Sequence, residues 1–366
     1  MVNALPRLGR QGYTSGRQQI MEADVMTNAA ATGLPFDDIR ALLRSLPEPQ
    51  EHAAAHAAER NRQLIKPEGS LGRLEEINAW LASWQTGGAP AVTRPMVALF
   101  ATSHGVALRD GAAPRIEATR RMMEALAAGG AAVNQLCVAH ELGLKIFDLA
   151  IDHPTPDISS AEALPEADCA ATMAFGMEAI AGGTDLLILG DLAIGNGIVA
   201  AAICLALYGG AAEDWLCAAP GDDAASLGRK ASLVREAVAF HAGHLSDPLE
   251  VLRRLGGREV MAIAGAILAA RHQYIPVLLD GHVVCAAAAV LHAINPAVLD
   301  HCLAAHRSPD AAHGRLLEKL AKAPLLDLGI KLGEGTGAAL AVGLVKAAVQ
   351  CHSGMATHEQ AAVTAG

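Results

Sequence analysis

The stretch DLLILGDLAIGNG, residues 185–197, decides the fold. Its first five residues are mostly aliphatic and have the length of a strand buried on both faces, and a glycine-rich turn then leads into a helix. Similar apolar runs occupy residues 96–101, 144–151, 215–218 and 275–279, with helical stretches between them. Because parallel strands need crossover connections, which are right-handed, the sequence predicts an α/β fold with a doubly wound, mostly parallel sheet flanked by helices.

The rest of the chain predicts a division into parts. Residues 31–90 are expected to form the N-terminal part of a small helical domain, 91–340 the α/β domain, and 341–366 the C-terminal helical part of the small domain. Residues 1–30 carry three arginines and no apolar segment, which is typical of a disordered extension and not of a secretory signal. Two long uncharged windows, 192–212 and 281–299, lack flanking basic and aromatic anchors and are expected to be buried helices.

Composition excludes several classes of partner. The 366 residues carry a net charge of −10 without a basic block, which argues against nucleic acid and anionic membranes. The seven cysteines are scattered and form no CxxC pair, so we expect reduced thiols and a cytoplasmic location, with no metal site and no cofactor. Small anionic ligands remain compatible with an acidic chain, because backbone N–H groups can hold a phosphate.

Polar, small or acidic residues follow each predicted strand. Ligands of doubly wound sheets bind outside the carboxyl ends of the strands, so these residues predict one pocket rim. They are Ser103-His104, Asp152-His153, Gly190-Asp191, Asp222-Asp223 and Asp280-Gly281-His282. The glycine-rich turn after Gly190 is suited to a phosphate, although it is neither GxGxxG nor a Walker A loop. Lys230 could neutralise that phosphate or, equally, belong to a solvated basic pair with Arg229.

A second glycine-flanked stretch, LGEGTGAAL at residues 332–340, holds one carboxylate, Glu334. Gly333 and Gly335 remove side-chain bulk around it, and a helix that begins just afterwards would direct its positive end into the same space. Spacing alone is equally consistent with an ordinary helix start. No GxSxG elbow is present, and Asp222-Asp223 lacks the threonine and glycines of a diphosphate-binding loop, so an Mg²⁺-dependent diphosphate transferase is disfavoured.

Seven blocks in order resemble the nicotinate-nucleotide–dimethylbenzimidazole phosphoribosyltransferase family, which makes the lower-ligand nucleotide of cobalamin. The blocks are KPEGSLGRLEE (66–76), SHGVA (103–107), AGGAAVN (128–134), GDLAIGN (190–196), HLSDPLEVLRRLGGREVMAIAGAILAA (244–270), VLLDG (277–281) and PLLDLGIKLGEGTGAALA (324–341). The resemblance implies transfer of the 5-phosphoribosyl group from nicotinate mononucleotide to 5,6-dimethylbenzimidazole, with inversion at C1′. It also implies a homodimer whose active sites lie near the subunit interface.

The resemblance assigns roles to particular residues. Glu334 matches the catalytic base, and Asp191 is the candidate for a second carboxylate near C1′. Phosphate and ribose contacts are expected from Gly190, Leu192, Ala193, Gly195, Asn196, Lys230, Gly335 and Thr336. Contacts to the aromatic base are expected from Ser103, His104, Leu332 and Gly333.

Three departures from the family pattern leave other functions open. Asp191 stands where the family has a glutamate, Gly197-Ile198 replaces two threonines, and Ser103 replaces Asp or Asn before His104. The shorter Asp191 retracts its carboxylate by about 1.5 Å. A diverged paralogue that binds nucleotide or base with little turnover, or takes a different base, is therefore the alternative. A nucleosidase, in which water replaces the benzimidazole, is a third possibility.

Overall fold

The computed structural model describes residues 33–110, 116–219 and 221–364, so the expectation for residues 1–30 lies outside the described residues. Five strands form one sheet in the order β2-β1-β3-β4-β5, and every pair is parallel. They are β1 (Pro95–Ala101), β2 (Gly143–Asp148), β3 (Leu186–Leu192), β4 (Val277–Leu279) and β5 (Cys302–Ala304). The order reverses between β1 and β3, which confirms the doubly wound prediction and places a ligand crevice at their carboxyl ends.

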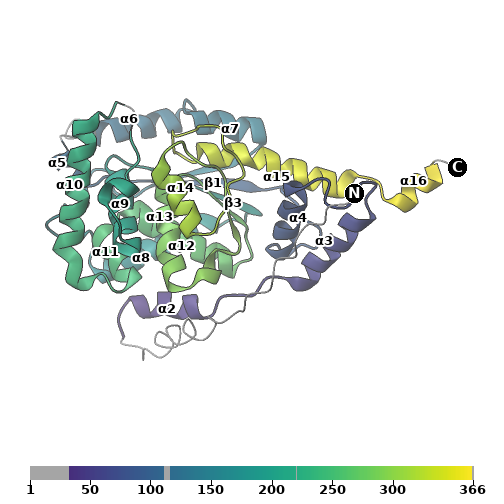
Figure 1. Ribbon diagram of the computed structural model, residues 1–366, viewed down its shortest axis with the longest axis horizontal. Coiled ribbons are helices and arrows are strands. Elements are labelled where there is room, and N and C mark those ends of the chain that lie inside the picture. The colour runs from purple at the N-terminus through teal and green to yellow at the C-terminus, as the bar shows by residue number, and fades with distance from the viewer. Residues whose placement is uncertain (1–32, 111–115, 220, 365–366) are drawn as a thin grey trace, which may run out of the picture.

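Successive side chains of a strand point to opposite faces of the sheet, so the sheet separates two hydrophobic cores. In β1, Ala98 and Phe100 face one helical layer, whereas Val97 and Leu99 face the other. In Figure 1, α6, α7 and α15 lie above the strands, and α8, α11 and α12 lie below them. The first core is covered by α8 (Glu166–Met177), α9 (Asn196–Tyr208), α10 (Ala224–His241), α11 (Pro248–Leu255), α12 (Arg258–His272), α13 (His282–Ile294) and α14 (Ala311–Lys319). The second is covered by α4 (Arg73–Ser83), α6 (Ile116–Ala127), α7 (Ala132–His140) and α15 (Thr336–Gly354).

The two ends of the described chain meet beside the sheet. Helix α3 (Glu51–Gln63) packs on α4, and α4 packs on α15. Arg60 donates hydrogen bonds of 2.8 Å to the carbonyls of His352 and Ser353, and Leu64 pairs with Thr357 before α16 (His358–Thr364). The division into two domains stays a prediction, since α15 runs without a break across residue 340 and contacts both β3 and α4.

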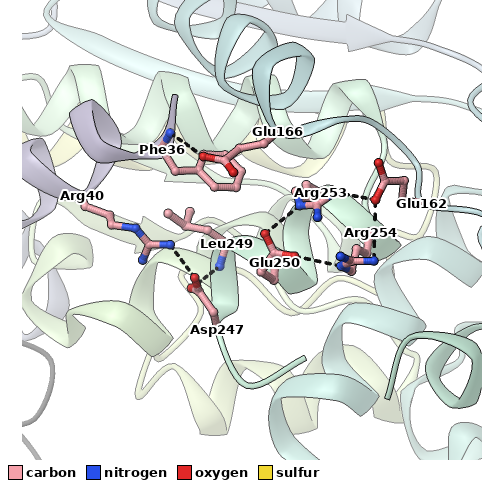
Figure 2. A network of polar contacts seen from close by, with 9 residues as sticks. All are labelled: Phe36, Arg40, Glu162, Glu166, Asp247, Leu249, Glu250, Arg253 and Arg254. Carbon is pink, nitrogen blue, oxygen red and sulfur yellow. Dashed lines mark hydrogen bonds and ion pairs between the residues drawn. The ribbon is translucent and has the colours of Figure 1, made fainter. Parts of the chain in front are cut away.

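Helix α2 (Phe36–Arg44) lies apart from α3 and α4, against α8 (Figures 1 and 2). The amide of Phe36 donates to Glu166 of α8 over 3.0 Å, and Arg40 pairs with Asp247, which also caps α11 through the amide of Leu249. Figure 2 shows the ion pairs that continue from this anchor along α11, which join Glu162, Glu250, Arg253 and Arg254. The contacts of Phe36 with Glu166 and of Arg40 with Asp247 hold α2 on the layer that carries α8 and α11.

One predicted strand is wrong and one was missed. Residues 215–218 are not a strand: Ala212–Trp215 is a 3-10 helix, and Trp215 packs on Tyr208 at the end of α9 while its indole N–H donates to the carbonyl of Gly209. The strand next to β4 is β5, whose short apolar run, 302–305, is bounded by His301 and His306 and was not recognised. The predicted strand 144–151 ends early, at Asp148, whose carboxylate accepts from the amide of Ile151.

The uncharged windows contain α9 and α13, whose central residues are buried, as predicted. Residues 117–140 are apolar and long enough to cross a membrane by composition. The chain breaks there at Gly129, with a φ of 79°, into α6 and α7 of 12 and 9 residues. Each is shorter than the roughly 20 residues that a spanning helix needs.

Candidate active site

A cavity of about 420 Å³ lies at the carboxyl ends of β3 and β4. This volume lies within the usual range for small-molecule sites. Its walls come from the loop after β3, the segment before α10, the starts of α13 and α14, and the glycine-rich loop before α15, together with one face of α6.

Three helices begin at this cavity. Gly195, with a φ of 93°, precedes α9, Gly281, with a φ of 33°, precedes α13, and Gly335, with a φ of 73°, precedes α15. A side chain at Gly195 would also place its Cβ 2.8 Å from that of Ala107. Helix N-termini carry partial positive charge and free N–H groups, so this arrangement can hold an anion on an acidic protein.

Glu334 occupies a strained backbone position on the cavity wall. Gly333, Glu334 and Gly335 all have left-handed φ angles, of 76°, 59° and 73°. That conformation costs a residue with a Cβ about 1–2 kcal/mol. The buried Asp280, directly after β4, holds the loop by accepting the amides of Gly335 (3.1 Å) and Ala338 (2.9 Å). Strain that the surroundings enforce is characteristic of functional positions.

The Glu334 side chain is only 6% exposed, and no described residue donates a hydrogen bond to its carboxylate. Burial, followed by the negative charge of Asp280, raises the pKa of Glu334. Asp280 in turn contacts His306 Nε2 at 3.1 Å. Burial is the largest single influence and lowers the pKa of His306, but the hydrogen bond to Asp280, the negative charge of Asp280 and a backbone hydrogen bond at Arg307 together raise it. An unpaired carboxylate with a raised pKa is suited to accept a proton near neutral pH.

Asp191 lies at the end of β3, on the same wall. Its carboxylate accepts a hydrogen bond of 2.6 Å from the side-chain amide of Asn196. Burial, followed by the negative charge of Glu259, raises the pKa of Asp191 to about 8. Glu259 is fully buried and contacts His104 Nε2 at 2.9 Å. The carboxyl group of Asp191 therefore keeps its proton to a higher pH than an ordinary aspartic acid does.

Most of the predicted contacts meet at this cavity. Its wall includes Asp191, Leu192, Ala193, Gly195, Asn196, Lys230, Leu332, Gly333 and Glu334. Gly190 and Gly335 lie directly behind the wall, where the backbone of one packs on the backbone of the other. Thr336 is buried in the first turn of α15, and its hydroxyl has no hydrogen-bond partner among the described residues.

Besides Gly190, seven residues of the predicted rim are not part of the cavity wall: Ser103, His104, Asp152, His153, Asp222, Asp223 and Asp280. Ser103 donates to the carbonyl of Ile151 over 2.6 Å, and His104 contacts Glu259, so both are buried behind the cavity. Their role in binding the aromatic base stays a prediction, although neither is part of the cavity wall. Asp152 and His153 are exposed on the surface.

Several lining residues were not predicted from the sequence. They are Asp110, Thr119, Met122, Cys217, His306, Ser308 and Lys331. Lys331 belongs to the same block as Glu334, three positions earlier, and could have been included on that ground. His306 and Ser308 follow β5, so they were overlooked together with that strand.

Asp191→Asn is expected to change how stability depends on pH. Because folding raises the pKa of Asp191 from 3.8 to about 8, the folded state binds this proton more tightly. The free energy of unfolding therefore falls as pH rises between these values, and by roughly 2–5 kcal/mol in total. The Asn variant keeps the hydrogen bond from Asn196 and should be more stable than the parent at pH 9, with little difference at pH 4. Urea unfolding of the ligand-free protein at both pH values measures this, and equal pH dependence in both proteins would contradict it.

Known proteins resemble this chain in sequence and in fold. A family model described as Phosphoribosyltransferase matches residues 46–363. Proteins named nicotinate-nucleotide–dimethylbenzimidazole phosphoribosyltransferase from Allorhizobium ampelinum and Rhizobium meliloti are 63% and 62% identical to this chain. Each match spans 92% of this chain and, in turn, 98% and 99% of the relative. The crystal structure of the protein of that name from Thermus thermophilus is 35% identical, with a TM-score of 0.77 over 86% of this chain and 99% of that one.

Proposed function

The chain belongs to the nicotinate-nucleotide–dimethylbenzimidazole phosphoribosyltransferase family, and from that premise we propose that Glu334 is the general base of its reaction. The protein is a phosphoribosyltransferase of cobalamin lower-ligand synthesis. The proposed reaction transfers the 5-phosphoribosyl group of nicotinate mononucleotide to 5,6-dimethylbenzimidazole and gives α-ribazole 5′-phosphate and nicotinate. The observation that carries the proposal is the buried, unpaired carboxylate of Glu334 on the wall of a substrate-sized cavity.

The reaction requires a base and no general acid. Nicotinate leaves C1′ with the electrons of the glycosidic bond, so the pyridinium becomes a neutral ring and needs no proton. The benzimidazole attacks C1′ through one nitrogen, and the proton on its other nitrogen must be removed. Glu334 takes that proton, and its raised pKa brings it closer to the working pH. Attack opposite the leaving ring converts the β-linked nucleotide into the α-linked product.

Asp191 and the helix termini support the nucleotide in this scheme. The phosphate is placed at the start of α9, near Lys230, where the helix end favours an anion. The positive pyridinium, and later the positive charge developing at C1′, favour the ionised form of Asp191. Binding of the nucleotide thus offsets the burial that keeps Asp191 protonated in the empty site.

The binding of the aromatic base and the contacts between subunits belong to the same proposal. Leu332 and Met122 provide apolar surface on the cavity wall, which suits a planar aromatic base. A homodimer whose active sites lie near the subunit interface is part of the proposal. A cytoplasmic location is part of the proposal as well.

The test is a product assay with nicotinate mononucleotide and dimethylbenzimidazole, without added metal. The proposal expects stoichiometric nicotinate and α-ribazole 5′-phosphate. If the nucleotide binds but no product forms with dimethylbenzimidazole or with any other aromatic base, the result would instead support the diverged paralogue. The retracted carboxylate of Asp191 favours that alternative. Nicotinate release that does not depend on the base would identify a nucleosidase.

A further inference from the structure

The ammonium group of Lys230, the proposed phosphate contact, is already engaged by a carboxylate. Asp222, in the segment before α10, contacts Lys230 Nζ through both oxygens, at 2.7 and 2.6 Å. The two side chains are 10% and 6% exposed. Asp110, also on the cavity wall, lies with one oxygen 4.0 Å from the same ammonium. Its other oxygen lies 3.8 Å from Arg229 Nε and accepts no hydrogen bond from the described residues.

These contacts neutralise the positive charge that a phosphate would meet. Lys230 pairs with Asp222, and Asp110 also lies 3.8 Å from Arg229, so two cations and two carboxylates sum to zero and no net positive charge remains to attract the phosphate. An ammonium has three donors, and Asp222 accepts two of them. One donor remains for a phosphate, so a phosphate that engages Lys230 through two donors must displace an oxygen of Asp222.

Asp222 retains other partners after such a displacement. Its carboxylate also accepts from the hydroxyl of Ser226 at 2.7 Å and from the amide of Ala219 at 2.7 Å. Both lie close to the start of α10, where the helix end favours a negative charge. Loss of the lysine therefore does not leave a buried carboxylate without hydrogen bonds.

We propose that Asp222 holds the place of the substrate phosphate on Lys230 in the empty site, and that the nucleotide displaces it. The inference rests on the proposed function, in which Lys230 binds the 5′-phosphate. The affinity for the nucleotide then depends on the difference between the interaction free energies of Lys230 with the phosphate and with Asp222. Asp222 thus weakens nucleotide binding, while it keeps Lys230 ordered and neutralised. Asp222 is thus an affinity-setting residue that makes no lasting contact with the substrate.

Asp222→Asn is the deciding variant, and Asp223→Asn is its matched control. Asp223 is the neighbouring residue and caps α10 through the amide of Ser226, but it makes no described contact with Lys230. Binding of nicotinate mononucleotide to the full chain is measured by calorimetry without the benzimidazole, at constant ionic strength. We expect Asp222→Asn to tighten binding by about tenfold, because one opposing charge is removed near the phosphate. Asp223→Asn should change binding by less than about threefold.

Two further arms separate the possible outcomes. Nicotinate riboside lacks the phosphate, so its affinity should be the same for Asp222→Asn and the parent. Lys230→Met should weaken nicotinate mononucleotide binding by tenfold or more. If Asp222→Asn weakens binding as Lys230→Met does, Asp222 orients the lysine and the inference is overturned. If Lys230→Met has no effect, the phosphate is bound elsewhere and the assignment of Lys230 fails. The exposed Lys331 is then the alternative cation. The product assay still tests the overall reaction independently.

Discussion

Glu334→Gln is expected to lower kcat by at least about a hundredfold, while the Kd for nicotinate mononucleotide stays within a few-fold of the parent. General bases contribute on the order of 10²–10⁴ in rate. Glutamine has the same shape, so the strained loop and the two hydrogen bonds from backbone amides to Asp280 remain. Only the proton acceptor is lost. Steady-state kinetics with saturating base, together with calorimetric nucleotide binding, measure the two quantities separately.

The pH dependence provides an independent test of the same residue. In the parent, kcat should rise with pH through the raised pKa of Glu334, because only the ionised carboxylate accepts the proton. In Glu334→Gln the residual rate should lose this dependence. An unchanged kcat, or an identical pH profile in the variant, would remove Glu334 from the mechanism.

The sheet was largely predictable because parallel strands covered on both faces are continuous apolar runs. The predictions for β1, β3 and β4 rest on such runs, and the structure confirms them as strands. The same criterion failed at residues 215–218, where the apolar character comes from a buried tryptophan that packs against α9 and not from a strand. It also failed at β5, whose apolar run of four residues is bounded by His301 and His306, whereas the equally short β4 lies in the longer run 275–279.

The site was predictable where its residues share a short segment. Gly190 to Asn196 runs from the end of β3 to the start of α9, and Leu332 to Thr336 leads into α15, so in each short segment sequence neighbours are also spatial neighbours. Contacts between distant segments could not be predicted. Asp280 was placed on the rim, but its hydrogen bonds to the Glu334 loop, 55 and 58 residues away, depend on how β4 meets α15.

The pairing of Lys230 with Asp222 shows the same limit at shorter range. The sequence left Lys230 as a phosphate ligand or a solvated lysine, and the structure shows it buried and paired instead. The identity of a basic residue predicts its charge. Whether that charge is available to a ligand depends on which carboxylates the fold brings to it.

Gly190→Ala is expected to lower kcat by about a hundredfold or more without unfolding the protein. Gly190 lies in β3, and its φ is not in the left-handed region, so the backbone itself accepts alanine. The obstacle is the Glu334 loop: the new Cβ would lie 2.5 Å from the amide nitrogen of Gly335 and 3.0 Å from the carbonyl carbon of Glu334. Normal contact requires the peptide to move by about 1 Å, and a displacement of that size costs roughly a hundredfold in rate.

The matched control and the stability measurement keep this prediction specific. Gly228→Ala, on an exposed part of α10, adds the same methyl group where no atom lies within 4 Å, and it should retain parental kcat. Overpacking in Gly190→Ala should cost about 1–3 kcal/mol, which thermal unfolding detects as a lower Tm with a cooperative transition. A folded Gly190→Ala protein with parental kcat would show that the close contact of β3 does not position Glu334. The loop would then depend on Asp280 alone for its geometry.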